Sequence, residues 1–201
     1  MKALLVDLDQ WVRNGTAPPP SSFPKIANGT LVPLEKIAWP AIPGFPHTPS
    51  YHRVWRMNFG PQFARGIDTT EPPILGQQYP VLLPQVDIDG TDLGGIRMPE
   101  GAVPIATFTG WNQRIDGVGF PAENVDFVGS MVPFAMTAAE RKASGDPRLS
   151  IEERYPSKAA YMARYENYVR ALASQRLLLD SDIPIEIGRG EQFWDFANKP
   201  R

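Results

Sequence analysis

The two histidines are the first residues whose types and spacing could support catalysis. His47 and His52 lie five positions apart in the segment FPHTPSYHRVW, beside Tyr51 and Arg53. An imidazole can act as a general base or bind a metal ion. A metal site would need more ligands, and neither an H-x-x-x-H helix nor a carboxylate cluster adjoins this pair. The catalytic residues are therefore unknown, with His52 as the candidate; the alternative is that both histidines are structural or exposed.

A second polar cluster ends the segment VPIATFTGWNQR. Trp111, Asn112 and Arg114 combine an indole ring, an amide and a guanidinium. Such a group can hold a ligand by stacking and hydrogen bonds. The competing interpretation is structural, in which these residues fasten the end of a strand to a neighbouring segment. We predict that the cluster borders a ligand or substrate cleft.

The segment DIDGTD resembles the opening of a calcium loop. The EF-hand pattern requires a glycine at its sixth position and a glutamate at its twelfth, whereas the twelfth residue here is Met98. Asp89-Gly90 instead favours a two-residue hairpin turn, in which both central residues have positive φ. The sequence therefore predicts a turn, no metal site and no cofactor.

An acyl-transfer site has no recognisable nucleophile in this sequence. The chain has no Cys, and the G-x-S-x-G pattern does not occur; Gly129-Ser130 lacks the flanking residues and precedes an apolar run. A serine nucleophile also needs a histidine base and an acid, presented on a strand–turn–helix elbow. We do not expect a complete hydrolase site within these 201 residues.

Composition excludes several classes of partner. The net charge is −2 and the pI is about 5.7, so we expect no binding to nucleic acid or to an anionic membrane. No apolar run approaches the roughly 18 residues of a membrane span. Asp7 and Asp9 interrupt the apolar start of the chain, which argues against a signal peptide. The cellular compartment stays unknown.

The elements that must position these residues change along the chain. Of 22 prolines, 16 lie within residues 1–104, and proline both removes a backbone donor and keeps the preceding residue out of a helix. Interspersed aromatic and aliphatic residues argue against disorder, so we expect extended arms held on another surface. Ahead of them, residues 3–13 predict an amphipathic helix that stops at Asn14-Gly15. Its apolar stripe needs a partner surface and consists of Leu4, Leu5, Leu8, Trp11 and Val12.

The middle of the chain predicts short strands. We expect a hairpin near IANGTLVP, an extended piece at residues 51–59, and a hairpin in which 81–85 and 93–97 flank the DIDGTD turn. Residues 102–109 predict a third strand, which would complete a small antiparallel meander. The prolines confine these strands to edges or short pairings.

The last third predicts helices. Thr137 with Glu140 and Ser150 with Glu153 each form a capping box ahead of a short helix. Ser157 caps the longest helix, to about residue 178, and a weaker helix runs from 183 to 194. The expected fold is therefore α+β with high irregular content. Its parts are the helix at 1–14, Pro-rich arms and a meander at 15–136, and a helical region at 137–201.

Several segments together resemble the C-terminal part of a bacterial family of alpha/beta hydrolase domain proteins. The resemblance spans nearly the whole chain in one order. The matching segments are ALLVDLDQWVRNGTAPPPS, FPKIANGT with the overlapping ANGTLVP, WPAIPGFP, YPVLLPQVDIDGTDLGGIRMPE, VPIATFTGWNQR and VPFAMTAAERKASGDPRLSIEERY.

This resemblance implies where the chain would sit in an α/β-hydrolase-type protein. The helix at 1–14 would be the last core helix, directly after the loop with the catalytic histidine, and residues 14–201 would wrap the core. The family's nucleophile and histidine segments have no counterpart here, and neither His47 nor His52 occupies the matching place. The implied partner is a hydrolase core domain or upstream polypeptide, and the implied substrate is a small-molecule ester.

Three functions remain open from the sequence. The first is a C-terminal portion of an alpha/beta-hydrolase-like protein, inactive without its core. The second is a stand-alone module that binds a ligand or a protein. The third is an independent acid–base enzyme that uses His52 with a nearby aspartate.

Overall fold

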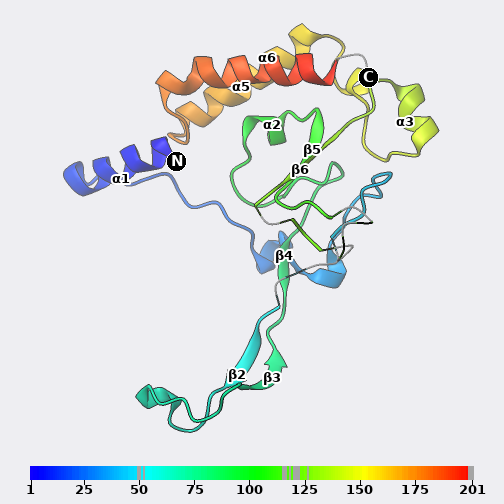
Figure 1. Ribbon diagram of the computed structural model, residues 1–201. Coiled ribbons are helices and arrows are strands. Elements are labelled where there is room, and N and C mark those ends of the chain that lie inside the picture. The colour runs from blue at the N-terminus through cyan, green and yellow to red at the C-terminus, as the bar shows by residue number, and fades with distance from the viewer. Residues whose placement is uncertain are drawn as a thin grey trace.

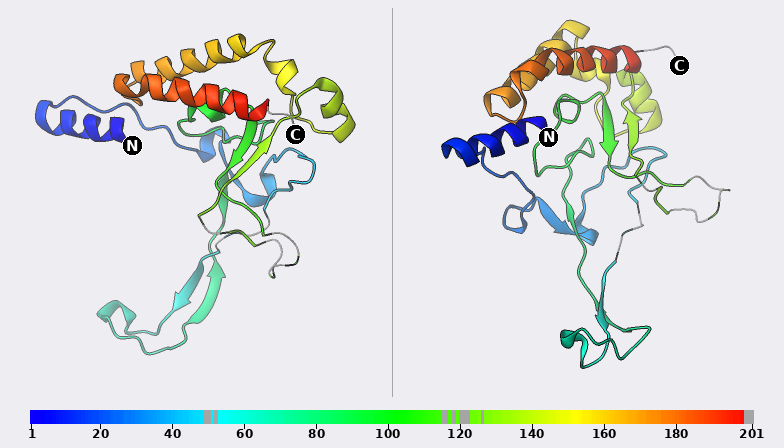
Figure 2. Two further views of the ribbon diagram at one scale, coloured as in Figure 1. Left: turned by 45° about the horizontal axis from the view of Figure 1, so that its top comes forward. Right: turned by 60° about the vertical axis from the view of Figure 1, so that its left-hand side comes forward.

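The computed structural model describes residues 1–48, 51, 53–114, 117, 119, 123–125 and 127–198. Across these residues it contains six α-helices and three two-stranded antiparallel sheets (Figure 1). The mixture of helices, short strands and long irregular segments agrees with the predicted composition of the fold. In Figures 1 and 2, the two longest helices lie side by side at one end of the molecule, and a thin β-arm projects from the opposite end.

The helical C-terminal third confirms the capping signals. The Thr137 and Ser150 hydroxyls each accept the N3 backbone N–H, and Glu140 and Glu153 return a carboxylate to the cap. Ser157 accepts from the Ala160 backbone N–H, as expected. The helices are α3 (Ala138–Ser144), α4 (Ile151–Arg154), α5 (Lys158–Ser174) and α6 (Ile183–Ala197), with a 3₁₀ turn, η4 (Asp180–Asp182), before α6.

Helix α5 ends earlier than the sequence predicts. It stops at Ser174, and Arg176 takes a left-handed backbone conformation with φ 63°. The Arg176 guanidinium then reaches the N-terminal segment, where it donates to the Ala17 carbonyl at 2.9 Å. This long-range contact has no signal in the local sequence.

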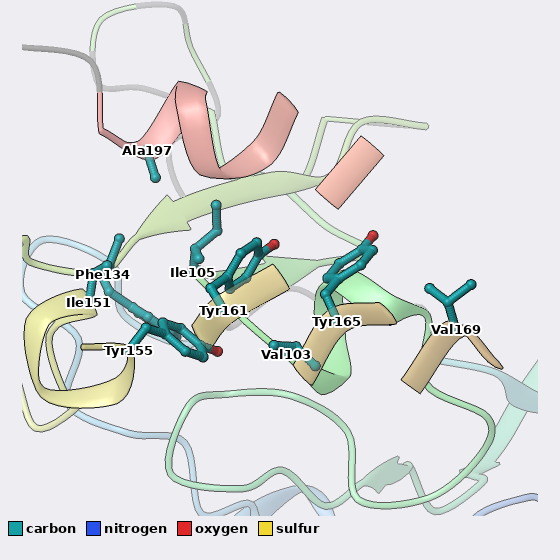
Figure 3. Packing of buried hydrophobic residues seen from close by; sticks show 9 residues of the cluster. All are labelled: Val103, Ile105, Phe134, Ile151, Tyr155, Tyr161, Tyr165, Val169 and Ala197. Carbon is teal, nitrogen blue, oxygen red and sulfur yellow. The ribbon is translucent and has the colours of Figure 1, made fainter. Parts of the chain in front are cut away.

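The core lies between α5, α6 and the start of strand β5 (Ala106–Thr109). Figure 3 shows the buried cluster, in which Tyr161 and Tyr165 project from α5 toward Ile105 and α6. Tyr161, Tyr165 and Val169 have no exposed side-chain surface, because they occupy the face of α5 that packs on α6. The tyrosines on this face of α5 therefore serve packing.

The strands pair over longer distances than predicted. Strand β1 (Leu31–Pro33) pairs with β4 (Leu82–Pro84), with Val32 opposite Leu83. The expected hairpin at IANGTLVP is wrong, because residues Ile26–Asn28 form a 3₁₀ turn, η1. The Lys25 carbonyl accepts the backbone N–H groups of Thr30 and Leu31, which lead into β1. A second 3₁₀ turn, η2 (Leu34–Lys36), follows β1.

The DIDGTD segment forms the expected hairpin turn, although of a different type. The predicted strand at 93–97 is wrong, because pairing beyond the turn is limited to the bridge between Val86 and Asp92 and to the Leu93 N–H, which donates to the Gln85 carbonyl at 2.8 Å. The Asp87 N–H donates to the Thr91 carbonyl at 2.9 Å, and Val86 bridges Asp92. The Asp87–Thr91 pairing leaves a loop of three residues. Only Gly90 among the described turn residues has positive φ, at 76°, whereas the expected two-residue turn needs positive φ at both central residues. The cause is Asp87, whose carboxylate accepts the backbone N–H groups of Asp89 and Thr91 and holds the turn open.

The predicted three-stranded meander is wrong. Residues Pro99–Ala102 form a short helix, α2, with Pro99 at its first turn. Strand β5 therefore begins at Ala106, and it pairs with β6 (Ser130–Pro133) instead of with the hairpin. Nothing in the local pattern of residues 102–109 indicates that β6 is the partner strand of β5.

The β-arm consists of β2 (Trp55–Asn58), a 3₁₀ turn η3 (Phe63–Arg65) and β3 (Ile74–Gln78). The extended piece predicted at residues 51–59 is thus confirmed by β2. Side chains of both strands are almost all exposed, which fits the projection of the arm from the body in Figure 2. A lone two-stranded ribbon has little stability of its own.

Helix α1 (Lys2–Asn14) confirms the predicted N-terminal helix, and Gly15 ends it with φ 70°. It is fastened to the turn between α5 and α6. Lys2 pairs with Asp182 at 2.9 Å, and Asp7 pairs with Arg176 at 2.5 Å. Because Ala3 and Asp7 form the buried face, the apolar stripe faces outward.

Candidate ligand pocket and docking helix

A pocket of about 530 Å³ opens between the Pro-rich segment around residues 37–48, the DIDGTD hairpin and the end of β5. We refer to it as the aromatic pocket. Its lining is mainly apolar, with Ile37, Leu83, Val86, Ile96, Met98 and Phe108 from several elements. Pockets of this size usually hold small molecules, because they can surround most of the surface of such a ligand.

Aromatic rings form one wall of the aromatic pocket. Trp39, His47 and Trp111 contact one another with ring centroids 5.1 to 5.7 Å apart. Behind them, Phe45 stacks on Trp111 at 5.0 Å and an interplanar angle of 9°. The Trp39 indole N–H donates to the Phe45 carbonyl at 3.3 Å, which folds residues 39–45 around Trp111.

Trp111 is held at the end of β5 by two hydroxyls. Thr109 donates to the Trp111 carbonyl at 2.5 Å, and Ser130 of β6 donates to the same oxygen at 3.0 Å. The β5–β6 pairing therefore sets where the indole ring lies. Ser130, considered as a nucleophile in the sequence, has this structural role.

The polar part of the aromatic wall is a His–Tyr pair. The Tyr51 hydroxyl lies 2.7 Å from His47 Nδ1. Partial burial lowers the pKa of His47 and raises the pKa of Tyr51, so both are neutral at pH 7. A neutral imidazole here can exchange a hydrogen bond with a ligand without adding charge.

Thr91, Asp92 and Arg97 also line the aromatic pocket. Arg97 forms an ion pair with Asp87 at 2.8 Å and donates to the carbonyl of Asp92 at 2.9 Å. Thr91 Oγ1 is buried and has no hydrogen-bond partner among the described residues.

Two carboxylates outside the pocket lining, those of Asp89 and Asp146, form ion pairs within the fold. Asp89 makes a bidentate ion pair with Arg154 of α4, whose Nη1 lies 2.9 Å from Oδ2. Arg148, almost fully buried, pairs with Asp146 at 2.6 Å and donates to Thr107 of β5 at 2.8 Å. Within the described ranges no group of three potential metal ligands comes together.

The second candidate surface is the apolar stripe of α1. Leu5 is 64% exposed, Trp11 53% and Val12 77%, and Leu4 and Leu8 are also about half exposed. Five neighbouring apolar side chains on one helix face are more than the scattered exposure usual for a surface helix. No helix in the part of the chain described is both long and apolar enough to cross a membrane.

Comparison with protein families decides the relationship of the chain. A family model described as alpha/beta hydrolase domain matches residues 1–184. The chain belongs to this alpha/beta hydrolase domain family. No curated protein and no solved structure matches it.

Within this hydrolase-family chain, the structure places the predicted cleft residues differently. Trp111 lines the aromatic pocket. Asn112 and Arg114 instead extend the strand end by backbone pairing: the Val125 N–H donates to the Asn112 carbonyl at 2.7 Å, and the Arg114 N–H donates to the Glu123 carbonyl at 2.9 Å. Their side chains do not line the pocket, and that of Arg114 is exposed.

His52, the candidate catalytic residue, lies outside the described residues. The other histidine, His47, lines the aromatic pocket beside Trp39 and Trp111. The sequence offered one signal for this role, because His47 follows the aromatic segment WPAIPGFP. That Thr91 lines this pocket was not predicted, since a threonine in a turn carries no signal of its own.

Proposed function

We propose that this chain acts as the C-terminal part of an alpha/beta-hydrolase-like protein that hydrolyses esters or amides. In this proposal it is inactive without a hydrolase core domain that provides the nucleophile and the catalytic histidine. The observation that carries the proposal is the exposed apolar stripe of α1. Membership in the hydrolase family supports the reaction class.

The orientation of α1 supports docking through its stripe. The polar contacts of Lys2 and Asp7 with Asp182 and Arg176 hold one face of α1 against the α5–α6 turn. The opposite face then presents Leu5, Trp11 and Val12 to solvent. Covering apolar surface contributes about 25 cal/mol per Å², so a helix face of this kind favours a protein partner.

The β-arm supports the same arrangement. Trp55 is 39% exposed, Met57 51% and Ile74 61%, and both strands lack a packed face. A ribbon with apolar side chains on its surface gains stability when it lies on another domain. In the proposal, α1 and the β-arm both pack on the surface of one hydrolase core domain.

The proposal is tested with 4-nitrophenyl butyrate as substrate. The 201-residue chain alone should give no turnover, and co-expression with a serine-containing hydrolase core of this family should give a complex that is active. Robust turnover by the chain alone, abolished by a serine-directed inhibitor, would disprove the proposal.

Stripe variants make this test specific. Leu5→Gln with Val12→Gln should abolish association with the core and leave the melting temperature of the chain unchanged, because both side chains are exposed. Arg13→Gln, on the same helix, is the matched control and should associate normally. Association of the stripe variant at wild-type affinity would count against docking through α1.

A second candidate function is small-molecule binding by the chain itself. The aromatic pocket, with its volume of about 530 Å³ and its wall of Trp39, His47 and Trp111, favours it. A rise in melting temperature with a small-molecule ligand would support this function. It is compatible with the first, since a pocket in a hydrolase accessory region can hold part of the substrate.

A further inference from the structure

Asp92 brings a carboxylate to the lining of the aromatic pocket. It bridges Val86 across the DIDGTD hairpin, and directly opposed residues of an antiparallel pair project from the same face of the ribbon. Val86 lines the aromatic pocket and is buried, whereas Asp92 lines the same pocket and stays exposed. The Asp92 side chain therefore lies on the pocket side of the hairpin and is accessible to a ligand.

The Asp92 carboxylate forms no ion pair with any of the described residues. Arg97, which also lines the pocket, pairs with Asp87 at 2.8 Å and donates to the backbone carbonyl of Asp92. The two carboxylates and the one guanidinium therefore leave one net negative charge. Partial desolvation raises the pKa of the Asp92 carboxyl above its ordinary value of 3.8, although the charge of Arg97 lowers it. A cation in the pocket would thus be attracted by a carboxylate that water screens incompletely.

Aromatic rings provide the second feature of a cation site. The interplanar angle is 50° between Trp39 and His47, 53° between Trp39 and Trp111, and 80° between His47 and Trp111. The rings therefore form tilted walls and not a parallel stack. All three line the pocket and are only partly buried, which leaves ring surface open to a ligand. Indole rings attract cations, and groups of aromatic rings recognise quaternary ammonium ions.

Other classes of ligand fit this lining less well. A metal ion needs several oxygen or nitrogen ligands, and no three His, Asp or Glu side chains come together in the part of the chain that the structure describes. An anion would be repelled by Asp92, because Arg97 is already paired with Asp87. A neutral molecule would gain nothing from the net negative charge.

We infer that the aromatic pocket binds a small organic ammonium ion with apolar substituents. The ammonium group lies against the indole rings of Trp39 and Trp111, with Asp92 as its counter-ion. The substituents contact aliphatic side chains of the lining such as Ile96 and Met98. This inference rests on the second proposed function, small-molecule binding, and adds the chemical class of the ligand.

Three molecules of nearly one shape test the ligand class. Choline is cationic, 3,3-dimethylbutan-1-ol is its neutral carbon analogue and 3,3-dimethylbutanoate is anionic. Each is titrated at pH 7.5 into the ¹⁵N-labelled 201-residue chain. We expect choline to shift the indole N–H signals of Trp39 and Trp111 and the backbone amide signal of Asp92, with an affinity at least about fivefold above that of the other two molecules.

The outcomes of this titration separate the ligand class from the binding role. An affinity for the alcohol or the anion that comes within about fivefold of the choline affinity, or exceeds it, would overturn the ligand class but leave the binding role intact. The absence of shifts at these signals with all three molecules would overturn both.

The variant Asp92→Asn separates the charge from the shape of the pocket. It keeps the size of the side chain and removes the carboxylate, so the affinity for choline should fall about fivefold while the affinity for the alcohol stays unchanged. The melting temperature should not change, because the residue is exposed. Asp68→Asn, at an exposed position between η3 and β3, is the matched control and should bind choline normally. An Asp92→Asn protein that binds choline as the wild type does would overturn the assigned counter-ion.

Discussion

Asp7 and Arg176 join the N-terminal helix to the helical C-terminal third, with Asp7 Oδ1 only 2.5 Å from the Arg176 guanidinium. The aspartate is buried on α1, and the arginine stands in a left-handed conformation just after α5. Arg176 also donates to Gln10 at 3.0 Å and to the Ala17 carbonyl at 2.9 Å. One side chain thus holds the N-terminal helix and the start of the Pro-rich arm against the helical third.

Replacing Arg176 by Ala should release α1. The change leaves the buried Asp7 carboxylate without its cation, and we expect a loss of about 2 kcal/mol, below the range for a fully buried pair because Arg176 is partly exposed. Hydrogen exchange should accelerate in α1 while α5 and α6 keep their protection. Arg170→Ala, which breaks the exposed pair with Glu166, is the control and should cost less than about 0.5 kcal/mol. Unchanged exchange in α1 would show that the ion pair does not anchor it.

Core tyrosines should respond differently to loss of their hydroxyls. Tyr155 donates to the Pro104 carbonyl at 2.9 Å, whereas the hydroxyls of Tyr161 and Tyr165 are buried and unpaired within the described structure. Tyr155→Phe should therefore destabilise the chain by about 1 kcal/mol, and Tyr161→Phe or Tyr165→Phe should be neutral or stabilising. Chemical denaturation of the three variants measures this. Equal losses in all three would contradict the assigned pairing.

Gly188 and Gly190 of α6 differ in the space that a side chain would have. A Cβ on Gly190 would lie 2.7 Å from the buried Tyr165 ring, while a Cβ on Gly188 meets nothing within 4 Å. Gly190→Ala should destabilise by about 1–3 kcal/mol through overpacking. Gly188→Ala should stabilise by about 0.5–1 kcal/mol, because alanine favours the helix. Thermal unfolding of both variants checks the packing of α6 on α5; a stabilising Gly190→Ala would show that this contact is wrong.

Glu153 should make the α3–α4 region sensitive to acid. Hydrogen bonds from the Ser150 backbone and hydroxyl, and then from Arg141, lower the pKa of Glu153 to about 2 from an ordinary value of 4.5. Because the folded pKa lies below the unfolded one, the stabilisation is present above pH 4.5 and is lost as the pH falls from about 4.5 to about 2.

Unfolding curves across this pH range measure the effect of Glu153. Glu153→Gln should be less stable than the wild type at pH 6, and the difference should shrink toward pH 2. The Glu191→Gln variant, at an exposed position of α6, is the control for a general effect of removing charge. A constant difference between Glu153→Gln and wild type from pH 6 to pH 2 would refute the titration.

Sequence reasoning succeeded mainly where the structure depends on capping and turn hydrogen bonds between near neighbours, although the turn at residues 25–31 was not predicted correctly. The capping boxes of Thr137 and Ser150 and the stop of α1 at Gly15 need only a few residues in a row. The DIDGTD hairpin was found for the same reason. Its turn type was wrong, because the Asp87 side chain competes for the turn N–H groups.

The amino-acid sequence by itself determined the helical third, the amphipathic α1 and the absence of a nucleophile motif from the chain. Tertiary structure alone decided that β1 pairs with β4, that β5 pairs with β6, and that Trp111 meets Trp39 and His47. Those contacts join segments far apart in the sequence, and their stability comes from burial that no local pattern records. For that reason the sequence could only predict that Trp111 borders a cleft, and the fold alone brought Trp111 together with Thr91 in one pocket.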